Sequence, residues 1–208
     1  MLDIHDFWLF VLSGLLLNLT PGVDTLYVLS SSLARRFKGG FIASLGIGMG
    51  CLVHVMAATV GLSAILMASA TTFMVVKTIG ALYLVYLGVK LILLCSTPSL
   101  VEKSATRSLR VIFWQGFLTN VLNPKVALFF LAFLPQFVDA QGSHKVLSML
   151  FLGAVFTFNG VLWSIFLAWS ATTFTHKLQR HALIMAWFYK IIGALFIYLG
   201  VRLWLQKA

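Results

Sequence analysis

Two short segments of this sequence place helix-breaking prolines beside polar side chains within long apolar stretches. The first holds Pro21 and Gly22, followed by Asp24, and the second holds Pro124, followed by Lys125. Proline removes a helical hydrogen bond, so each helix is expected to break there and to free backbone carbonyls and N–H groups. In lipid such groups need partners from protein or water. The two segments therefore predict a polar site that binds a solute or carries a proton.

Polar side chains surround both proline segments. The candidate residues for substrate binding or coupling are Asn18, Thr20, Pro21, Gly22, Asp24, Asn120, Asn123, Pro124 and Lys125. Asp24 and Lys125 could neutralise one another, or they could hold the opposite charges of a zwitterionic substrate. A purely structural ion pair explains them equally well, because buried pairs need not be functional. A simpler alternative is that Pro21 and Gly22 only kink the helix, with Asp24 solvated near its cytoplasmic end.

Two further polar residues lie inside apolar runs, His54 and Asn159. His54 follows Gly46 and Gly50 at successive steps of four residues, so the three share one face of a helix. Glycines at this spacing favour close helix packing. We expect His54 and Asn159 either to line a pathway or, as the favoured interpretation, to form hydrogen bonds between helices.

The composition indicates a membrane protein. Of the 208 residues, 61% are hydrophobic and only 10% are charged, and the mean hydropathy is +1.00. A soluble domain is closer to half apolar and a quarter charged. The net charge of +10 does not indicate nucleic-acid binding, because the basic residues fall in short gaps between apolar runs rather than on one soluble face.

Six apolar runs are long enough to cross a bilayer, which takes roughly 20 residues. They cover about 7–29, 41–66, 72–94, 112–134, 147–172 and 187–206. The odd-numbered gaps hold eight basic residues and the even-numbered gaps hold one, Lys145. The positive-inside rule then places the odd gaps in the cytoplasm and both termini on the outer side.

The two halves of the chain resemble each other. The matching segments are Lys77–Tyr83 with Lys190–Phe196, Tyr86–Leu91 with Tyr198–Leu203 and, more loosely, Thr20–Pro21 with Asn123–Pro124. Because each half holds three helices, the second half must enter the membrane from the opposite side. We therefore predict an all-α integral membrane protein with six transmembrane helices arranged as two inverted-topology three-helix repeats. It forms a single domain, 1–208, with repeat one at about 1–95, a cytoplasmic linker at about 96–111 and repeat two at about 112–208.

These segments resemble the LysE/RhtB family of amino-acid exporters. The resemblance rests on Asn18–Leu29, Lys38–Gly40, Gly80–Leu84, Tyr86–Gly88, Thr119–Ala127 and Phe133–Val138, which follow the family in order from end to end. Val23 stands where the family usually has a second proline. The resemblance implies export of an amino acid or related small metabolite across the bacterial cytoplasmic membrane, powered by an ion gradient.

Together the residues and the resemblance predict a site near the midplane of the bilayer. The N-termini of the half-helices would attract a substrate carboxylate, and freed carbonyls would hold its ammonium group. Asp24 is the candidate proton carrier, because a carboxyl group in a low-dielectric site takes up a proton more readily than one in water. Which amino acid is carried stays open, with a small neutral or zwitterionic compound favoured.

Other functions fit the sequence less well. A divalent-metal exporter would need several carboxylates or a His and Cys cluster. A membrane oxidoreductase of similar three-plus-three architecture would need matched cysteines, whereas Cys51 and Cys95 occupy unmatched positions. No motif of an intramembrane enzyme is found, and a scaffold needs no broken helices. We expect no cofactor and no metal, a small-molecule substrate and the lipid bilayer as partners, and no nucleic acid; a homo-oligomer is left open.

Overall fold

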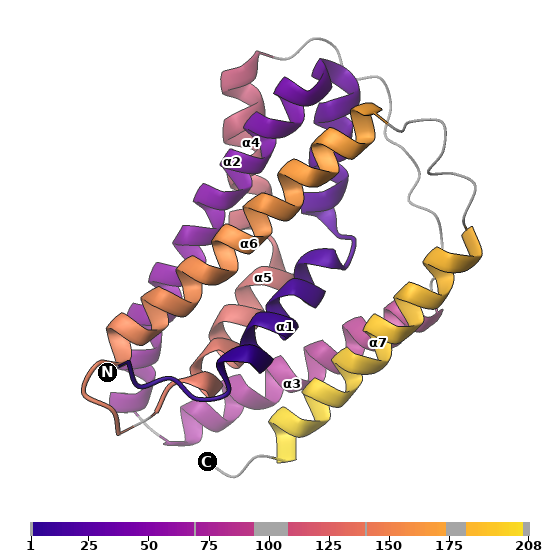
Figure 1. Cartoon of the computed structure of the whole chain (residues 1–208). Coiled ribbons are helices and arrows are strands. Elements are labelled where there is room, and N and C mark those ends of the chain that lie inside the picture. Colours follow the sequence, from indigo (N-terminus) through magenta and orange to yellow (C-terminus); the bar gives the residue numbers. More distant parts are fainter. Residues whose placement is uncertain (1, 69, 94–107, 140, 174–181, 206–208) are drawn as a thin grey trace.

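The computed structural model describes all residues except 1, 69, 94–107, 140, 174–181 and 206–208 (Figure 1). Its helices are α1 (Phe7–Leu19), α2 (Val23–Ala68), α3 (Ala70–Leu93), α4 (Leu109–Val121), α5 (Pro124–Leu128), the π-helix η1 (Phe129–Phe133), the 3-10 helix η2 (Leu134–Phe137), α6 (Lys145–Thr173) and α7 (Ala182–Leu205). The described part of the chain holds no strand, apart from one isolated bridge between Ile4 and Val138. The all-α class expected from the composition is confirmed.

Several helices are long and apolar enough to cross a bilayer. Within the described residues, the span 23–61 of α2 and the whole of α6 meet this requirement. The pair formed by α4 and the segment 124–137, bent by 46° at its break, is a third candidate if it counts as one span. The structure thus supports two to three spans in the part of the chain that it describes.

The helices form two packed groups (Figure 1). Helix α2 packs along both α4 and α6, and α1 packs on α6. Helices α3 and α7 pack on each other, and α3 also contacts η1. Within each group, helices from the first half of the chain pack against helices from the second half.

Glycines allow α2 to approach both of its neighbours closely. A Cβ atom at Gly46 would collide with the carbonyl oxygen of Phe113 on α4, and one at Gly50 would lie 2.7 Å from the carbonyl oxygen of Phe117. On the α6 side, a Cβ atom at Gly48 would lie 2.5 Å from Val161. The predicted packing role of Gly46 and Gly50 is confirmed.

Aromatic side chains fill the core next to the broken helices. The buried cluster includes Phe10, Phe129, Phe130, Phe133, Phe137 and Phe156, drawn from α1, η1, η2 and α6. Neighbouring rings lie 4.9–6.1 Å apart between centroids in stacked, tilted or edge-to-face arrangements, the geometries that aromatic pairs favour. This cluster gives the interrupted segments a rigid support.

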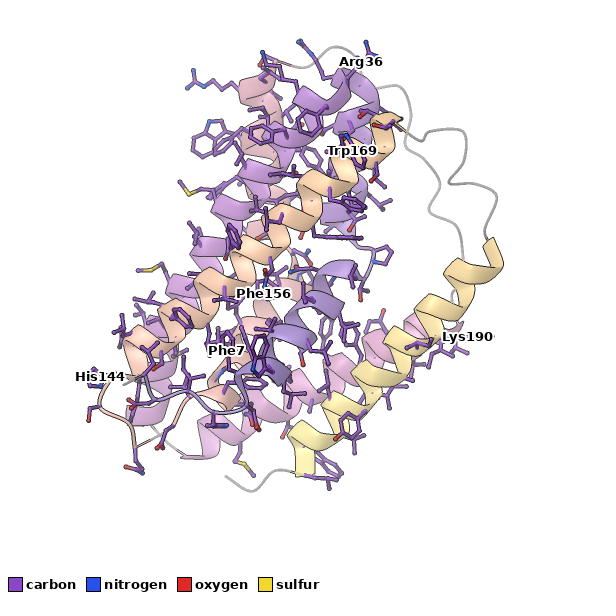
Figure 2. The ribbon with its side chains drawn as sticks, viewed as in Figure 1. Phe7, Arg36, His144, Phe156, Trp169 and Lys190 are labelled. Atoms are coloured by element: carbon purple, nitrogen blue, oxygen red, sulfur yellow. The ribbon has the colours of Figure 1, made fainter. Side chains whose placement is uncertain are left out.

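The helix boundaries differ from the apolar runs at one turn. The gap between the first two runs is a tight kink rather than a long loop, because α2 consists of two helices that meet at Arg35 and Arg36, where the backbone angles are non-helical. Arg36 has a φ of 55°, which is uncommon for a residue with a side chain. Arg36 and Trp169 lie at one end of the structure and His144 at the other, with Phe156 between them (Figure 2).

Candidate functional site

The first helix breaks where proline and glycine predict a break. Helix α1 ends at Leu19, and α2 begins at Val23. Thr20 caps the end of α1, and its hydroxyl donates a 2.7 Å hydrogen bond to the carbonyl oxygen of Leu16. The break forms although Val23 replaces the second proline that is usual in the resembling family. Asp24 consequently lies in the first turn of α2, where the helix dipole favours a negative charge.

The second break lies between α4 and α5. Helix α4 ends at Val121, and α5 starts at Pro124, the position where the missing N–H of proline costs least. Asn123 is the N-cap of α5, and its side-chain oxygen accepts a 3.0 Å hydrogen bond from the backbone N–H of Lys125. Both predicted interruptions are therefore present, each with polar side chains beside it.

Asp24 joins the two interruptions. Its Oδ2 atom accepts 2.9 Å hydrogen bonds from Asn120 Nδ2 and from Asn123 Nδ2. Both asparagines are buried. Hydrogen bonds to a charged acceptor are stronger than neutral ones, so the two amides hold the carboxylate in a fixed position.

Lys125 makes the reciprocal connection. Its Nζ atom donates a 2.8 Å hydrogen bond to the backbone oxygen of Thr20, a carbonyl freed by the first break. The ammonium group lies 3.6 Å from the point that a Cβ atom of Gly22 would occupy. The sequence left open whether Asp24 and Lys125 pair directly, and in the structure they form no ion pair within 4.0 Å. Each charge instead binds polar groups at the other helix break.

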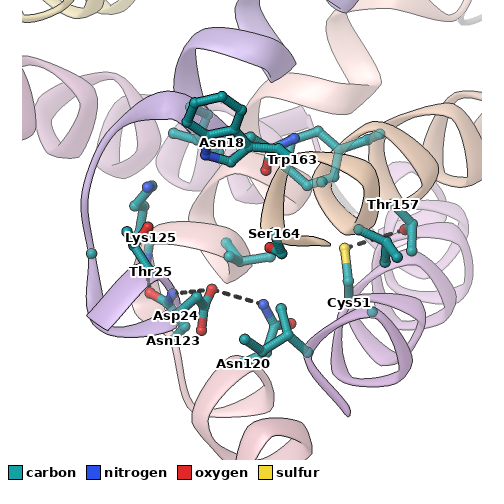
Figure 3. A pocket seen from close by; sticks show the side chains of 18 residues that line it. Asn18, Asp24, Thr25, Cys51, Asn120, Asn123, Lys125, Thr157, Trp163 and Ser164 are labelled. Carbon is teal, nitrogen blue, oxygen red and sulfur yellow. Dashed lines mark hydrogen bonds between the residues drawn. The ribbon is translucent and has the colours of Figure 1, made fainter. Parts of the chain in front are cut away.

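A small closed pocket lies between these groups (Figure 3). Helices α1, α2, α4, α5 and α6 line it through Leu17, Asn18, Gly22, Asp24, Thr25, Ile47, Gly48, Cys51, Asn120, Asn123, Lys125, Val126, Phe156, Thr157, Gly160, Val161, Trp163 and Ser164. Its volume is about 40 Å³, enough for a few water molecules, whereas ligand pockets typically measure roughly 300–1,000 Å³. The pocket in this structure is therefore much smaller than a typical ligand pocket.

The pocket wall holds several buried polar atoms without a partner. Within the described residues, these atoms are Asn18 Nδ2, Asp24 Oδ1, Asn120 Oδ1 and Trp163 Nε1. Buried polar groups are nearly always hydrogen-bonded in proteins, so each exception calls for an explanation. Four exceptions at one pocket indicate a place for a polar ligand or for water.

The two pathway candidates lie outside this pocket. His54 Nε2 lies 2.9 Å from the backbone oxygen of Asn120, and its ring stacks on Phe130. His54 thus supports the segment that carries Asn120. Asn159 is half-buried on α6, next to Gly160 but outside the pocket lining. The other predicted residues are brought together, with Thr20 contributing its carbonyl oxygen and Pro21 and Pro124 the breaks themselves.

Helix α6 supplies further pocket residues, which were not predicted from the sequence. Thr157, Gly160 and Ser164 lie at steps of three and four residues, so they share one face, and Trp163 borders it. The Thr157 hydroxyl donates to the Gly153 carbonyl oxygen at 2.8 Å and lies 3.3 Å from Cys51 Sγ. The spacing of small and polar residues on α6 was the signal that could have revealed this wall.

A metal centre is not apparent in the described part of the chain, where no three His, Cys, Asp or Glu side chains gather. The donors at the pocket are one carboxylate, amides, hydroxyls and an ammonium group. This set suits hydrogen bonding to a polar organic solute better than coordination of a cation, which favours several carboxylates or a His and Cys cluster.

Long apolar helices, two interrupted segments and a closed polar pocket between them define a class, a helical membrane protein built to bind a solute within its span. The model of the family described as LysE type translocator matches residues 15–207. The chain therefore belongs to the LysE-type translocator family, and it is a membrane transporter rather than an enzyme.

Relatives cover nearly the whole chain. A leucine efflux protein of Salmonella choleraesuis (strain SC-B67) is 28% identical over 201 residues, which is 95% of this chain and 94% of the relative. The uncharacterised membrane proteins YrhP of Bacillus subtilis (strain 168) and PA4757 of Pseudomonas aeruginosa are 29% and 30% identical over 207 residues. They cover 95% and 97% of this chain and 98% and 96% of their own lengths. No solved structure matches this chain.

Proposed function

We propose that this protein exports an amino acid or a related small metabolite across the bacterial cytoplasmic membrane, coupled to an ion gradient. The observation that carries the proposal is the pocket in which Asp24 and Lys125 bind polar groups at the opposite helix break. A half-buried acid, a half-buried base and buried amides around one pocket suit a small solute that carries both charges. The leucine efflux protein of Salmonella supports this substrate class.

We further propose that the six apolar runs form two inverted repeats, with both termini on the outer side. Packing between α3 and α7 supports this arrangement. A Cβ atom at Gly88 on α3 would lie 2.5 Å from the carbonyl oxygen of Gly193 on α7. One at Gly200, the counterpart of Gly88 in the second half, would lie 2.7 Å from the carbonyl oxygen of Ala81. Gly193 matches Gly80, the neighbour of Ala81, in the alignment of the two halves, so the two contacts are nearly reciprocal, as expected for repeats related by a two-fold axis.

Transport would then proceed by alternating exposure of the pocket. Because the closed pocket holds only a few water molecules, an amino acid must enter from a state in which its walls have moved apart. Asp24 would take up a proton on one side and release it on the other, as its surroundings exchange between protein and water. Lys125 and the two asparagines would hold its charge in the closed state.

Export from intact cells tests this function. Cells lacking the gene and cells producing the protein are loaded with dipeptides, and amino acids in the medium are quantified by mass spectrometry. We expect one amino acid or a small set outside only when the protein is present. Asp24→Asn should lower export at least about tenfold, because an amide carries no proton and weakens a charged hydrogen-bond set worth about 1.5–3 kcal/mol per bond.

The control is Asp139→Asn, which removes an exposed carboxylate on the segment before α6. It should leave export unchanged. Equal export by the wild type and by Asp24→Asn against a gradient would refute the proton-carrier role. No difference in any amino acid between producing and lacking cells, with confirmed membrane insertion, would refute amino-acid export and direct attention to metal ions.

A further inference from the structure

The unpartnered polar atoms of the pocket are donors on one wall and acceptors on the other. Trp163 Nε1 is buried without a partner among the described residues. An indole N–H can only donate a hydrogen bond, so this part of the wall calls for an acceptor. Asn18 Nδ2 is a second unpartnered donor on this wall. The Asn18 side chain packs on α6 beside Gly160, 3.2 Å from the point that a Cβ atom would occupy there. The wall between α1 and α6 is therefore a hydrogen-bond donor site.

The opposite wall calls for donors. Asp24 Oδ2 is occupied by two asparagine amides, whereas Oδ1 is buried and unpartnered in the described structure. Asn120 Oδ1 is also unpartnered. Its orientation is fixed, because the Nδ2 atom must face the Asp24 carboxylate to which it donates. In the view of Figure 3, Asn18 and Trp163 lie on one side of the pocket, and Asp24 and Asn120 lie on the other.

The pocket also has apolar lining, and its charges balance. Leu17, Ile47, Val126, Phe156 and Val161 make up this apolar wall, and Thr25, Cys51, Thr157 and Ser164 contribute further polar groups to the lining. Asp24 and Lys125 contribute one negative and one positive charge, so the site favours a ligand without net charge. A bare amine would leave the Trp163 N–H unsatisfied, and a bare carboxylate would do the same to Asp24 Oδ1, each at a cost of about 1–3 kcal/mol.

We propose that Trp163 is a specificity-determining residue that, with Asn18, receives the carboxylate of a neutral zwitterionic substrate, while Asp24 and Asn120 receive its ammonium group. The apolar wall then faces the substrate's side chain. This inference rests on the proposed function for the choice of substrate, but it concerns binding and orientation alone. It names a residue on α6 that lies outside both proline segments.

Equilibrium binding tests it on the purified full-length protein in detergent. The probe is radiolabelled L-leucine, and the competitors are unlabelled L-leucine, 3-methylbutylamine, which lacks the carboxylate, and 4-methylpentanoate, which lacks the ammonium group. For the wild type we expect leucine to compete at concentrations at least about tenfold lower than either half-molecule, since each half leaves one wall unsatisfied.

Trp163→Phe keeps a planar aromatic ring, although a smaller one, and removes the indole N–H. It should weaken leucine binding roughly 10- to 100-fold, as expected for the loss of one hydrogen bond to a charged group. The concentration of 3-methylbutylamine that displaces half of the remaining bound leucine should be the same as in the wild type. The matched control is Trp114→Phe on α4, whose side chain is 51% exposed and lies outside the pocket; it should bind leucine as the wild type does.

Two results would overturn the inference. One is an equal loss for leucine and 3-methylbutylamine in Trp163→Phe, which indicates a packing role, or no loss at all. The other, which needs no variant, is that 3-methylbutylamine competes as well as leucine in the wild type, or that leucine does not bind to the folded protein. Selective binding without export would uphold this inference and refute the proposed function, whereas export without carboxylate selectivity would do the reverse.

Discussion

Lys125 connects the two helix interruptions at the scale of a single residue. Its ammonium group binds the Thr20 carbonyl oxygen, which has lost its helical partner at the first break. An unsatisfied carbonyl in an apolar interior is costly. The lysine therefore contributes to the stability of the breaks, in addition to any role with the substrate.

Replacement of Lys125 by methionine should lower the thermal stability of the detergent-solubilised protein. A lost hydrogen bond to a charged group costs about 1.5–3 kcal/mol, and each kcal/mol shifts the Tm of a chain of this size by about 2–4 °C. We expect a decrease of roughly 3–12 °C, measured by the intrinsic fluorescence of the tryptophans during heating. Lys38→Met, at an exposed position, should change the Tm by about 1 °C or less, and an equal shift for both variants would contradict this role.

The residues flanking the prolines were predictable because their chemistry is unusual within apolar runs. Asp24, Asn120, Asn123 and Lys125 each require a partner in lipid, and the structure brings them together. Trp163 was not predictable in this way. A tryptophan in an apolar run is typical of lipid-facing positions and of membrane interfaces, and only the packing of α6 against α1 places its N–H at the pocket.

Close helix packing through glycine governs the next scale, that of the helical elements. Gly46 on α2 faces the Phe113 carbonyl oxygen with no space for a Cβ atom. Gly61 on the same helix has no neighbouring atom of the described residues within 4 Å of the corresponding point. Gly46 is therefore a tightly packed position, and Gly61 is its control on the same helix.

Gly46→Ala should force α2 and α4 apart and destabilise the protein by about 1–3 kcal/mol, the usual cost of overpacking, with a Tm lower by roughly 2–12 °C. Gly61→Ala should leave the Tm unchanged or raise it, because alanine favours a helix over glycine by about 1 kcal/mol. Both are measured by thermal unfolding in detergent. A smaller loss for Gly46→Ala than for Gly61→Ala would contradict the packing account.

The helical type of the elements was predictable from the sequence, whereas their shape was not. The apolar run at 112–134 reads as one helix, but the structure divides it into α4, α5 and the π-helix η1. The proline at position 124 predicts the first division. Nothing in the residue types of Phe129–Phe133 predicts a π-helix, and four of these five residues pack into the buried core. Likewise, the bend at Arg35 and Arg36 depends on backbone angles that composition does not report.

At the scale of the whole molecule, the two ends of the bundle carry different polar residues. Arg36 lies at one end of the bundle and His144 at the other (Figure 2). The N-terminal segment is fixed near His144, because the Asp3 N–H donates a 3.0 Å hydrogen bond to the Ser148 hydroxyl and the Asp3 carboxylate accepts one from the His144 N–H at 2.6 Å. Asp139 and the N-terminal segment therefore belong to the same end, which the positive-inside rule assigns to the outer face.

Single cysteines test this orientation in living cells. In a background of Cys51→Ser and Cys95→Ser, one variant carries Lys38→Cys at the exposed turn of α2, and the other carries Gln141→Cys, an exposed position before α6. A membrane-impermeant maleimide added to intact cells should label Gln141→Cys and should reach Lys38→Cys only after the membrane is permeabilised. Basic residues resist translocation, so we expect the turn with Arg35, Arg36 and Lys38 to lie in the cytoplasm. The opposite labelling pattern would show that the molecule has the reverse orientation. The end that holds Asp139 and Asp3 would then not be the release side of an exporter.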